Sequence, residues 1–286
     1  MAVVGIDVAA SRPCTCVLVE SGRILDWLET EDLHDMAGWL ERRHPEVVAV
    51  DAPCATSQGL LRKRGDGGKP YAGRVCDREL RRRGIPLYEV PGDRKSAPAW
   101  MEVGFQIYGV LSELGYHQPR APRTTNSAIE VYPHASFVSL LGGAPAKKTT
   151  VEGRAQRTQI LERHGCFLDD RRDHDALDAL VAALTAERFL AAGACAVGNP
   201  GEALIWLPVD RLQERYSPLE RADGRLKARE LASLYETASE EDRDGLLQSL
   251  LAAASRGGEA MIEVLEAELL CRAPDELVKE YGDPDD

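Results

Sequence analysis

Two apolar segments that each end at or near an aspartate, residues 2–8 (AVVGIDV) and 46–51 (EVVAVD), constrain the fold most. Both are unbroken apolar runs, which is typical of strands buried on both faces. Between them the pattern predicts strands at 14–19 and 24–28, joined by a hairpin turn, and then a helix at 31–43. A hairpin meander followed by a helical crossover should place the first and fourth strands side by side and parallel.

Helical and strand-like patterns alternate through the rest of the first 216 residues. We expect helices at about 74–83, 98–115, 133–141, 149–164 and 174–191, and strands at 87–90, 127–132 and 203–207. This alternation indicates an α/β protein in which helices flank a sheet.

Charge divides the chain near residue 217. The whole sequence has a net charge of −12, and residues 217–286 alone hold 18 acidic and 8 basic side chains. We therefore expect one domain at 1–216 and an acidic extension at 217–286, whose leucines recur at helical spacing. Because the extension would repel a polyanion, it could mask basic residues of the domain or bind a protein partner.

Composition argues against a membrane or secreted protein. No apolar run approaches the roughly 20 residues that a spanning helix needs. The seven cysteines are scattered and have neither a CxxC motif nor zinc-site spacing. A cytoplasmic protein with free thiols and no membrane association is the simplest interpretation.

Four aspartates fall where the topology should bring them together. Asp7 lies near the end of the first strand and Asp51 ends the fourth, while Asp175 and Asp178 occupy the first turns of the helix at 174–191. Neighbouring carboxylates repel one another unless a cation lies between them, and Mg²⁺ or Mn²⁺ suits such oxygen ligands. Two bound metal ions would suit hydrolysis of a phosphodiester bond.

Two further residues are candidates for the chemistry. Glu130, in the strand at 127–132, is a candidate catalytic carboxylate, although it could instead pair with an arginine. His174 adjoins Asp175 and could move a proton. Any single acid here could equally be a turn or capping residue, so the order of the acids along the chain carries the hypothesis.

Basic residues in two segments could contact phosphate. The helix at 74–83 presents a stripe of arginines, whose alternative is a solvated face offset by Asp77 and Glu79. A second group surrounds the helix at 149–164 and could either clamp a phosphate or neutralise the aspartates. The candidate nucleic-acid-binding residues are Arg74, Arg78, Arg81, Arg82, Lys148, Arg154 and Arg157.

Seven segments, in order along residues 3–208, resemble the family catalogued as domain of unknown function 429, a group of predicted nucleases. The segments are VVGIDVA (3–9), VVAVDAPCA (47–55), RVCDRELRRRGI (74–85), IEVYPHASF (129–137), KKTTVEGRAQRTQIL (147–161), DHDALDALVAALTA (173–186) and GEALIWLP (201–208).

The resemblance implies a ribonuclease-H-like fold: a mixed five-stranded sheet of a three-stranded antiparallel meander plus parallel strands, flanked by helices, with acidic metal ligands. Its DxxD motif, Asp175 and Asp178, is similar to that of Holliday-junction resolvases more than to that of the ribonucleases H. Residues 217–286 lie outside the resemblance and would form a C-terminal helical extension.

The leading hypothesis is a metal-dependent nuclease that uses Mg²⁺ or Mn²⁺ and acts on DNA or RNA, a choice that the sequence leaves open. One alternative is a non-catalytic ribonuclease-H-like module that binds nucleic acid or protein. Another is an actin-like ATPase or sugar kinase, which also opens with a meander and an early aspartate. That class needs a glycine-rich phosphate turn after Asp7, where this sequence has Val8-Ala9-Ala10-Ser11.

Overall fold

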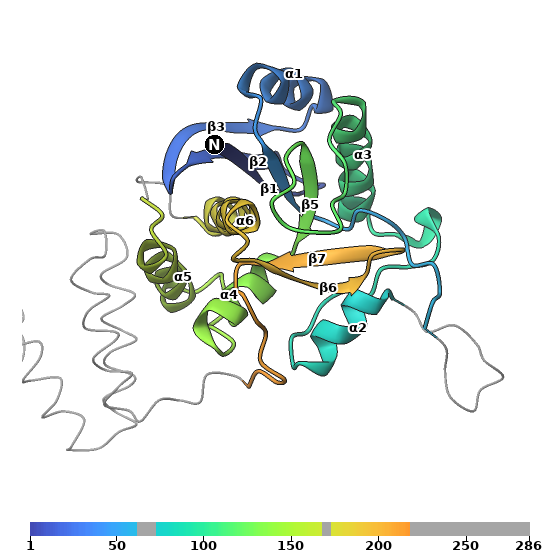
Figure 1. Cartoon of the computed structure of the whole chain (residues 1–286), viewed down its shortest axis with the longest axis vertical. Helices are drawn as coiled ribbons and strands as arrows, with labels where there is room; N and C mark the ends of the chain where they lie inside the picture. The colour runs from blue at the N-terminus through green and yellow to red at the C-terminus, as the bar shows by residue number, and fades with distance from the viewer. Residues whose placement is uncertain (62–72, 168–172, 218–286) are drawn as a thin grey trace, which may run out of the picture. The chain divides into compact units, whose positions relative to one another are not determined.

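The computed structural model describes residues 1–61, 73–167 and 173–217 (Figure 1). The strands are β1 (Ala2–Asp7), β2 (Cys14–Glu20), β3 (Arg23–Thr30), β4 (Val47–Asp51), β5 (Ser127–Val131), β6 (Cys195–Asn199) and β7 (Ala203–Leu207). The helices are α1 (Leu33–Arg43), α2 (Val75–Arg82), α3 (Ala99–Glu113), α4 (Pro133–Leu141), α5 (Val151–Arg163) and α6 (His174–Leu190), with a 3₁₀ turn at Arg94–Ser96.

The seven described strands form one mixed sheet in the order β3-β2-β1-β4-β5-β7-β6. Strands β1, β2 and β3 are an antiparallel meander, and β1, β4, β5 and β7 run parallel to one another. This is the ribonuclease-H-like arrangement expected from the sequence, with β7 and its antiparallel partner β6 extending the sheet beyond five strands.

The expected elements lie within two residues of their predicted bounds, with two exceptions. Residues 87–90 are irregular rather than a strand, and the backbone N–H of Val90 donates to the carboxylate of Asp77 in α2. Strand β6 was not predicted, because its short edge segment lacks alternation and contains Gly198 at a φ of 116°.

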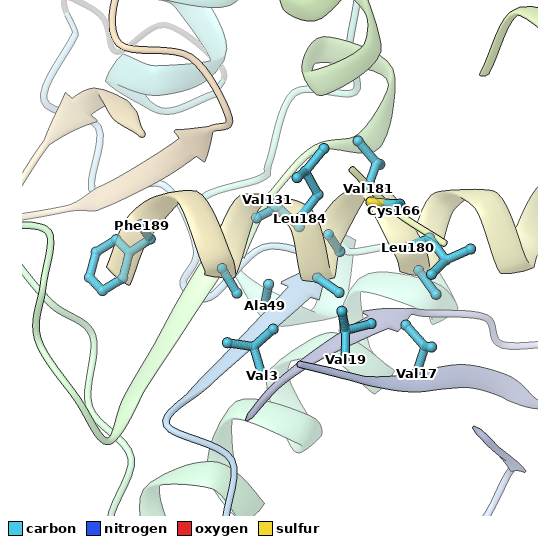
Figure 2. Close-up of a cluster of buried hydrophobic side chains, with 14 of the residues drawn as sticks. Val3, Val17, Val19, Ala49, Val131, Cys166, Leu180, Val181, Leu184 and Phe189 are labelled. Atoms are coloured by element: carbon cyan, nitrogen blue, oxygen red, sulfur yellow. The ribbon is translucent and has the colours of Figure 1, made fainter. Parts of the chain in front are cut away.

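Helices cover both faces of the sheet. One apolar cluster joins the sheet to α6 and α4, and Figure 2 shows Val3, Val19 and Ala49 of the sheet facing Leu180 and Leu184 of α6. The other face packs against α1 and α3. Successive side chains of a strand point to opposite faces, so these two clusters show on which face each strand residue lies.

The sheet and α6 approach each other closely at Gly5 of β1. A Cβ atom on Gly5 would lie 2.0 Å from the carbonyl oxygen of Ala179 and 2.5 Å from the amide nitrogen of Ala183. Only glycine leaves room for the backbone of α6 at this position. This contact sets Asp178, one residue before Ala179, beside the carboxyl end of β1.

The described residues of Met1–Pro145 and Arg157–Pro218 form one compact unit, and Ala146–Gln156 belong to a second unit. The predicted extension at 217–286 lies outside the described residues except for Ser217. In the described part of the chain, no helix is both long and apolar enough to cross a membrane.

Candidate functional site

Asp7 and Asp51 lie side by side on the α6 face of the sheet. They are register partners at the ends of the parallel strands β1 and β4. Val3 and Ala49, which contact α6, are separated from these aspartates by an even number of residues, so both carboxylates point to the same face. The side chain of Asp7 is buried, and Asp51 is partly exposed.

Helix α6 adds two more carboxylates near its N-terminus, those of Asp175 and Asp178. Asp173 caps the helix by accepting hydrogen bonds from the backbone N–H groups of Asp175 and Ala176. Asp178, one turn further on, is buried. Burial and the charge of Asp178 together raise the pKa of Asp7 to about 7, so these two carboxylates are close enough to repel each other.

Tyr132, the residue before α4, is close enough to Asp51 and Asp178 to be affected by their charges, while its hydroxyl donates to the carbonyl oxygen of Pro86. Burial, followed by the charges of Asp51 and Asp178, raises the pKa of the Tyr132 phenol. Asp7, Asp51, Asp175 and Asp178, which the sequence predicted to converge, therefore lie at the carboxyl ends of β1 and β4 and in the first turns of α6, the helix that covers this face of the sheet. We call these four residues the carboxylate site.

Arg12, which the sequence analysis did not single out, bridges two members of the carboxylate site. Its Nη2 lies 2.9 Å from Oδ2 of Asp7 and 2.6 Å from Oδ1 of Asp175. Burial disfavours the charged guanidinium, but the hydrogen bond to Asp7 and the charges of Asp7 and Asp175 together outweigh burial and raise the pKa of Arg12. The sequence feature that could have pointed to Arg12 is its position in the short loop between β1 and β2, five residues after Asp7.

Two more side chains adjoin the carboxylate site. His174 Nδ1 lies 2.5 Å from Oδ1 of Asp175. Arg157, expected to contact nucleic acid or to neutralise the aspartates, is only 3% exposed and stacks on Phe137, with its guanidinium carbon 5.2 Å from the ring centroid. Burial lowers the pKa of Arg157, while the charge of Asp178 opposes that shift. This placement favours neutralisation over contact with phosphate.

The carboxylate site fits a hard divalent cation in its donor atoms, because all four ligand candidates offer carboxylate oxygens at one edge of the sheet. Burial first, and then the charge of Asp178, raise the pKa of Asp7, and a cation beside this carboxyl group would favour its ionised form. Within residues 1–61, 73–167 and 173–217, however, no group of three or more His, Cys, Asp or Glu side chains is placed to hold a metal ion. Arg12 instead lies between Asp7 and Asp175.

Glu130 does not belong to the carboxylate site, contrary to the expectation of a catalytic role. It pairs in register with Val50, which packs on the α1 and α3 face, so its side chain points away from α6. Both of its oxygens accept hydrogen bonds from Arg74, at 2.8 and 2.6 Å, and the backbone N–H of Cys54 donates to one of them.

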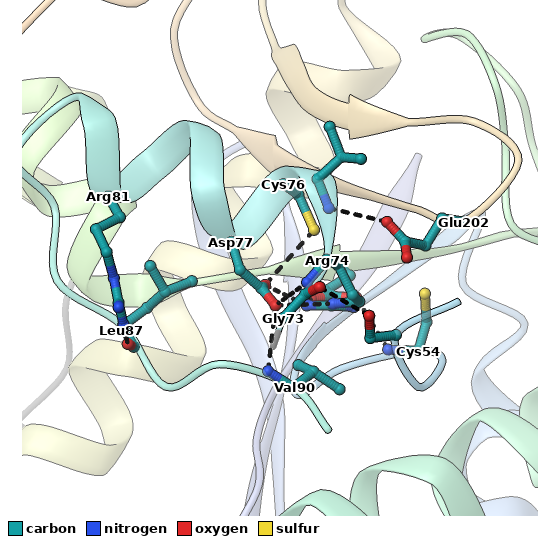
Figure 3. A network of polar contacts seen from close by, with 12 residues as sticks. Cys54, Gly73, Arg74, Cys76, Asp77, Arg81, Leu87, Val90 and Glu202 are labelled. Atoms are coloured by element: carbon teal, nitrogen blue, oxygen red, sulfur yellow. Dashed lines mark hydrogen bonds and ion pairs between the residues drawn. The ribbon is translucent and has the colours of Figure 1, made fainter. Parts of the chain in front are cut away.

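Arg74 is likewise not a surface residue able to meet phosphate. It is 2% exposed and also pairs with Asp77, its Nη2 lying 2.9 Å from Oδ1 (Figure 3). Burial disfavours its charge, but Glu130 and then Asp77 hold the pKa of Arg74 well above its usual value. We call Arg74, Asp77 and Glu130 the buried ion network.

The other predicted basic residues occupy varied positions. Arg81 is exposed and binds Glu89 at 2.6 Å, Arg82 is exposed, and Arg78 is partly buried and engaged in an interaction. Lys148 and Arg154 lie in the second unit, where Arg154 donates to the carbonyl oxygen of Thr149.

The family model described as "Protein of unknown function (DUF429)" matches residues 5–203. No curated protein gives a match. Among solved structures, Thermus thermophilus RuvC in complex with a Holliday junction substrate has 18% identity and a TM-score of 0.33. A second T. thermophilus RuvC structure has 20% identity and a TM-score of 0.34, and each match covers 67% of this chain and 96% of the RuvC chain. TM-scores this low carry no inference about activity or substrate.

Proposed function

The chain belongs to the DUF429 family, and from that premise we propose that it is a divalent-metal-dependent nuclease that hydrolyses phosphodiester bonds of nucleic acid. The observation that carries this proposal is the register pairing of Asp7 with Asp51 at the carboxyl ends of two parallel strands, on the face of the sheet covered by α6, the helix that contains Asp175 and Asp178. A buried group of acids is electrostatically costly, and a bound cation would relieve that cost.

Asp7, Asp51, Asp175 and Asp178 would hold Mg²⁺ or Mn²⁺. When bound, the ion supplies positive charge for the phosphate oxygens and the attacking water, which is the chemistry that a two-metal site provides. His174, beside Asp175, can hold or move a proton at its imidazole. The exposed Arg82 and the half-exposed Arg81 offer positive charge to the nucleic-acid backbone.

The experiment is cleavage of labelled DNA and RNA, offered as single strands, duplexes and branched junctions, with Mn²⁺ or with chelator. Asp7→Asn and Asp178→Asn should abolish metal-dependent cleavage. Asp173→Asn is the matched control: it changes the same charge at the same helix end, and asparagine caps a helix as well as aspartate does. Cleavage that survives in Asp178→Asn, or is lost equally in Asp173→Asn, would contradict the proposal.

One observation favours a second candidate, a non-catalytic module that binds nucleic acid or protein. Arg12 already provides a cation between two of the four aspartates, which a purely structural cluster would also require. Calorimetric titration with Mn²⁺ separates the candidates, because a module would show no binding that depends on Asp178.

A further inference from the structure

We propose that Arg12 is a displaceable counter-cation: its guanidinium closes the carboxylate site, and a divalent ion enters when Arg12 leaves Asp7 and Asp175. This inference rests on the proposed function, since it presupposes a metal ion at these carboxylates. It adds Arg12 to the site and a competition between its guanidinium and the metal ion, neither of which is revealed by metal-ligand patterns in the sequence.

The geometry of the bridge is that of a cation shared by two ligands. A single nitrogen, Nη2 of Arg12, contacts both Asp7 and Asp175, although these residues are 168 positions apart in sequence. The carboxylate of Asp7 is 4% exposed and that of Asp175 is 17% exposed. A metal ion bound by both carboxylates would need the same space, so the two cations exclude each other.

Arg12 brings a single positive charge to a site that holds four acids. Two of these acids, Asp7 and Asp178, are buried, where a nearby cation acts most strongly. One guanidinium carries a single charge, whereas a divalent ion carries two and suits several carboxylate ligands at once. Replacement of Arg12 by a divalent ion is therefore electrostatically favourable.

Arg12 also has space to move into, and a further acidic side chain lies beside that space. Its side chain is 37% exposed, in the loop between β1 and β2. A cavity of about 210 Å³ beside it is lined by Arg12, Cys14 and, as its one acidic lining residue, Glu31. In the proposal, the guanidinium released from Asp7 turns toward Glu31 across this cavity.

The test is calorimetric titration of the metal-free, full-length protein with Mn²⁺ alone, together with the loss of the free Mn²⁺ electron paramagnetic resonance signal. Arg12→Gln should bind Mn²⁺ about tenfold more tightly than the unmodified chain. Glu31→Gln should bind Mn²⁺ a few-fold more weakly, because the released Arg12 guanidinium can no longer pair with a carboxylate at position 31. In the Arg12→Gln background, Glu31→Gln should have no further effect, since the two residues act through one interaction.

Arg94→Gln is the control for net charge, because it removes an arginine that pairs with Glu102 away from the carboxylate site. Thermal melts show whether each variant is folded. Equal Mn²⁺ affinity in Arg12→Gln, Arg94→Gln and the unmodified chain would overturn the role of Arg12 and leave the proposed function standing. Absence of Asp178-dependent binding in every variant would instead overturn the metal site, and the proposed function with it.

Discussion

The carboxylate site and the buried ion network each combine acidic side chains with one bridging arginine. They differ in how far the arginine is buried and in how fully its charge is matched by the acids. In the buried ion network, Arg74 is 2% exposed and its charge is matched by hydrogen bonds to Glu130 and Asp77. In the carboxylate site, Arg12 is 37% exposed and the pKa of Asp7 remains raised.

The difference teaches which cluster is structural and which is suited to a ligand. A buried ion pair whose hydrogen bonds are satisfied is costly to open, so it holds β5 and α2 together. A group of acids that is paired with an arginine able to reach solvent is suited to accept another cation. Perturbed acids of this kind occur more often at functional sites than elsewhere.

The largest expected effect comes from breaking the buried ion network. Arg74→Met leaves Glu130 and Asp77 buried without their cation, and we expect a loss of about 3–5 kcal/mol in the free energy of unfolding. Urea denaturation measures this loss. Arg81→Met, the same substitution on the exposed side of α2, should cost less than about 1 kcal/mol. Similar small losses in both variants would mean that the network does not stabilise the fold.

The second effect is a pH dependence that originates at Asp7 of the carboxylate site. The pKa of Asp7 is about 7 in the folded chain against an ordinary value of 3.8. The folded chain therefore retains a proton that the unfolded chain has released, so metal-free stability should fall as pH rises from about 4 to about 7. The fall should be on the order of 2–4 kcal/mol.

Asp7→Asn should remove this part of the pH dependence and hold or raise metal-free stability near neutral pH. Urea denaturation with chelator at the two ends of that pH range makes the comparison. The Arg74 guanidinium of the buried ion network stays charged throughout this pH range. A difference between Asp7→Asn and the unmodified chain that does not change with pH would contradict the raised pKa.

The smallest expected effect on stability comes from replacing Arg82, an exposed arginine of α2. Arg82→Ala should change the free energy of unfolding by no more than about 0.5 kcal/mol. It should weaken nucleic-acid binding and reduce the slope of log K against log salt by about 1, as expected for one lost phosphate contact. Arg43→Ala on α1, which pairs with Asp26, is the control, and an equal loss there would indicate a net-charge effect alone.

Sequence periodicity was enough to predict the meander, the parallel pairing of β1 with β4 and therefore the meeting of Asp7 and Asp51. It failed for Glu130, because the phase of β5 against its neighbours decides which face a side chain occupies. A shift by one residue moves a side chain to the other face. It failed for Arg74 for a related reason: helical spacing shows which residues share a stripe but not whether that stripe faces solvent.

The sequence by itself determined the order of the elements and placed aspartates at the ends of two adjacent strands, because these properties depend on local periodicity and on the handedness of crossovers. Only the tertiary structure decided which arginine meets which acid. Arg12 reaches Asp175 across a sequence separation of 163 residues, and Arg74 reaches Glu130 across 56. Such pairs depend on the packing of α6 against Gly5 and on the register of β5 with β4, and no local sequence pattern predicts those contacts.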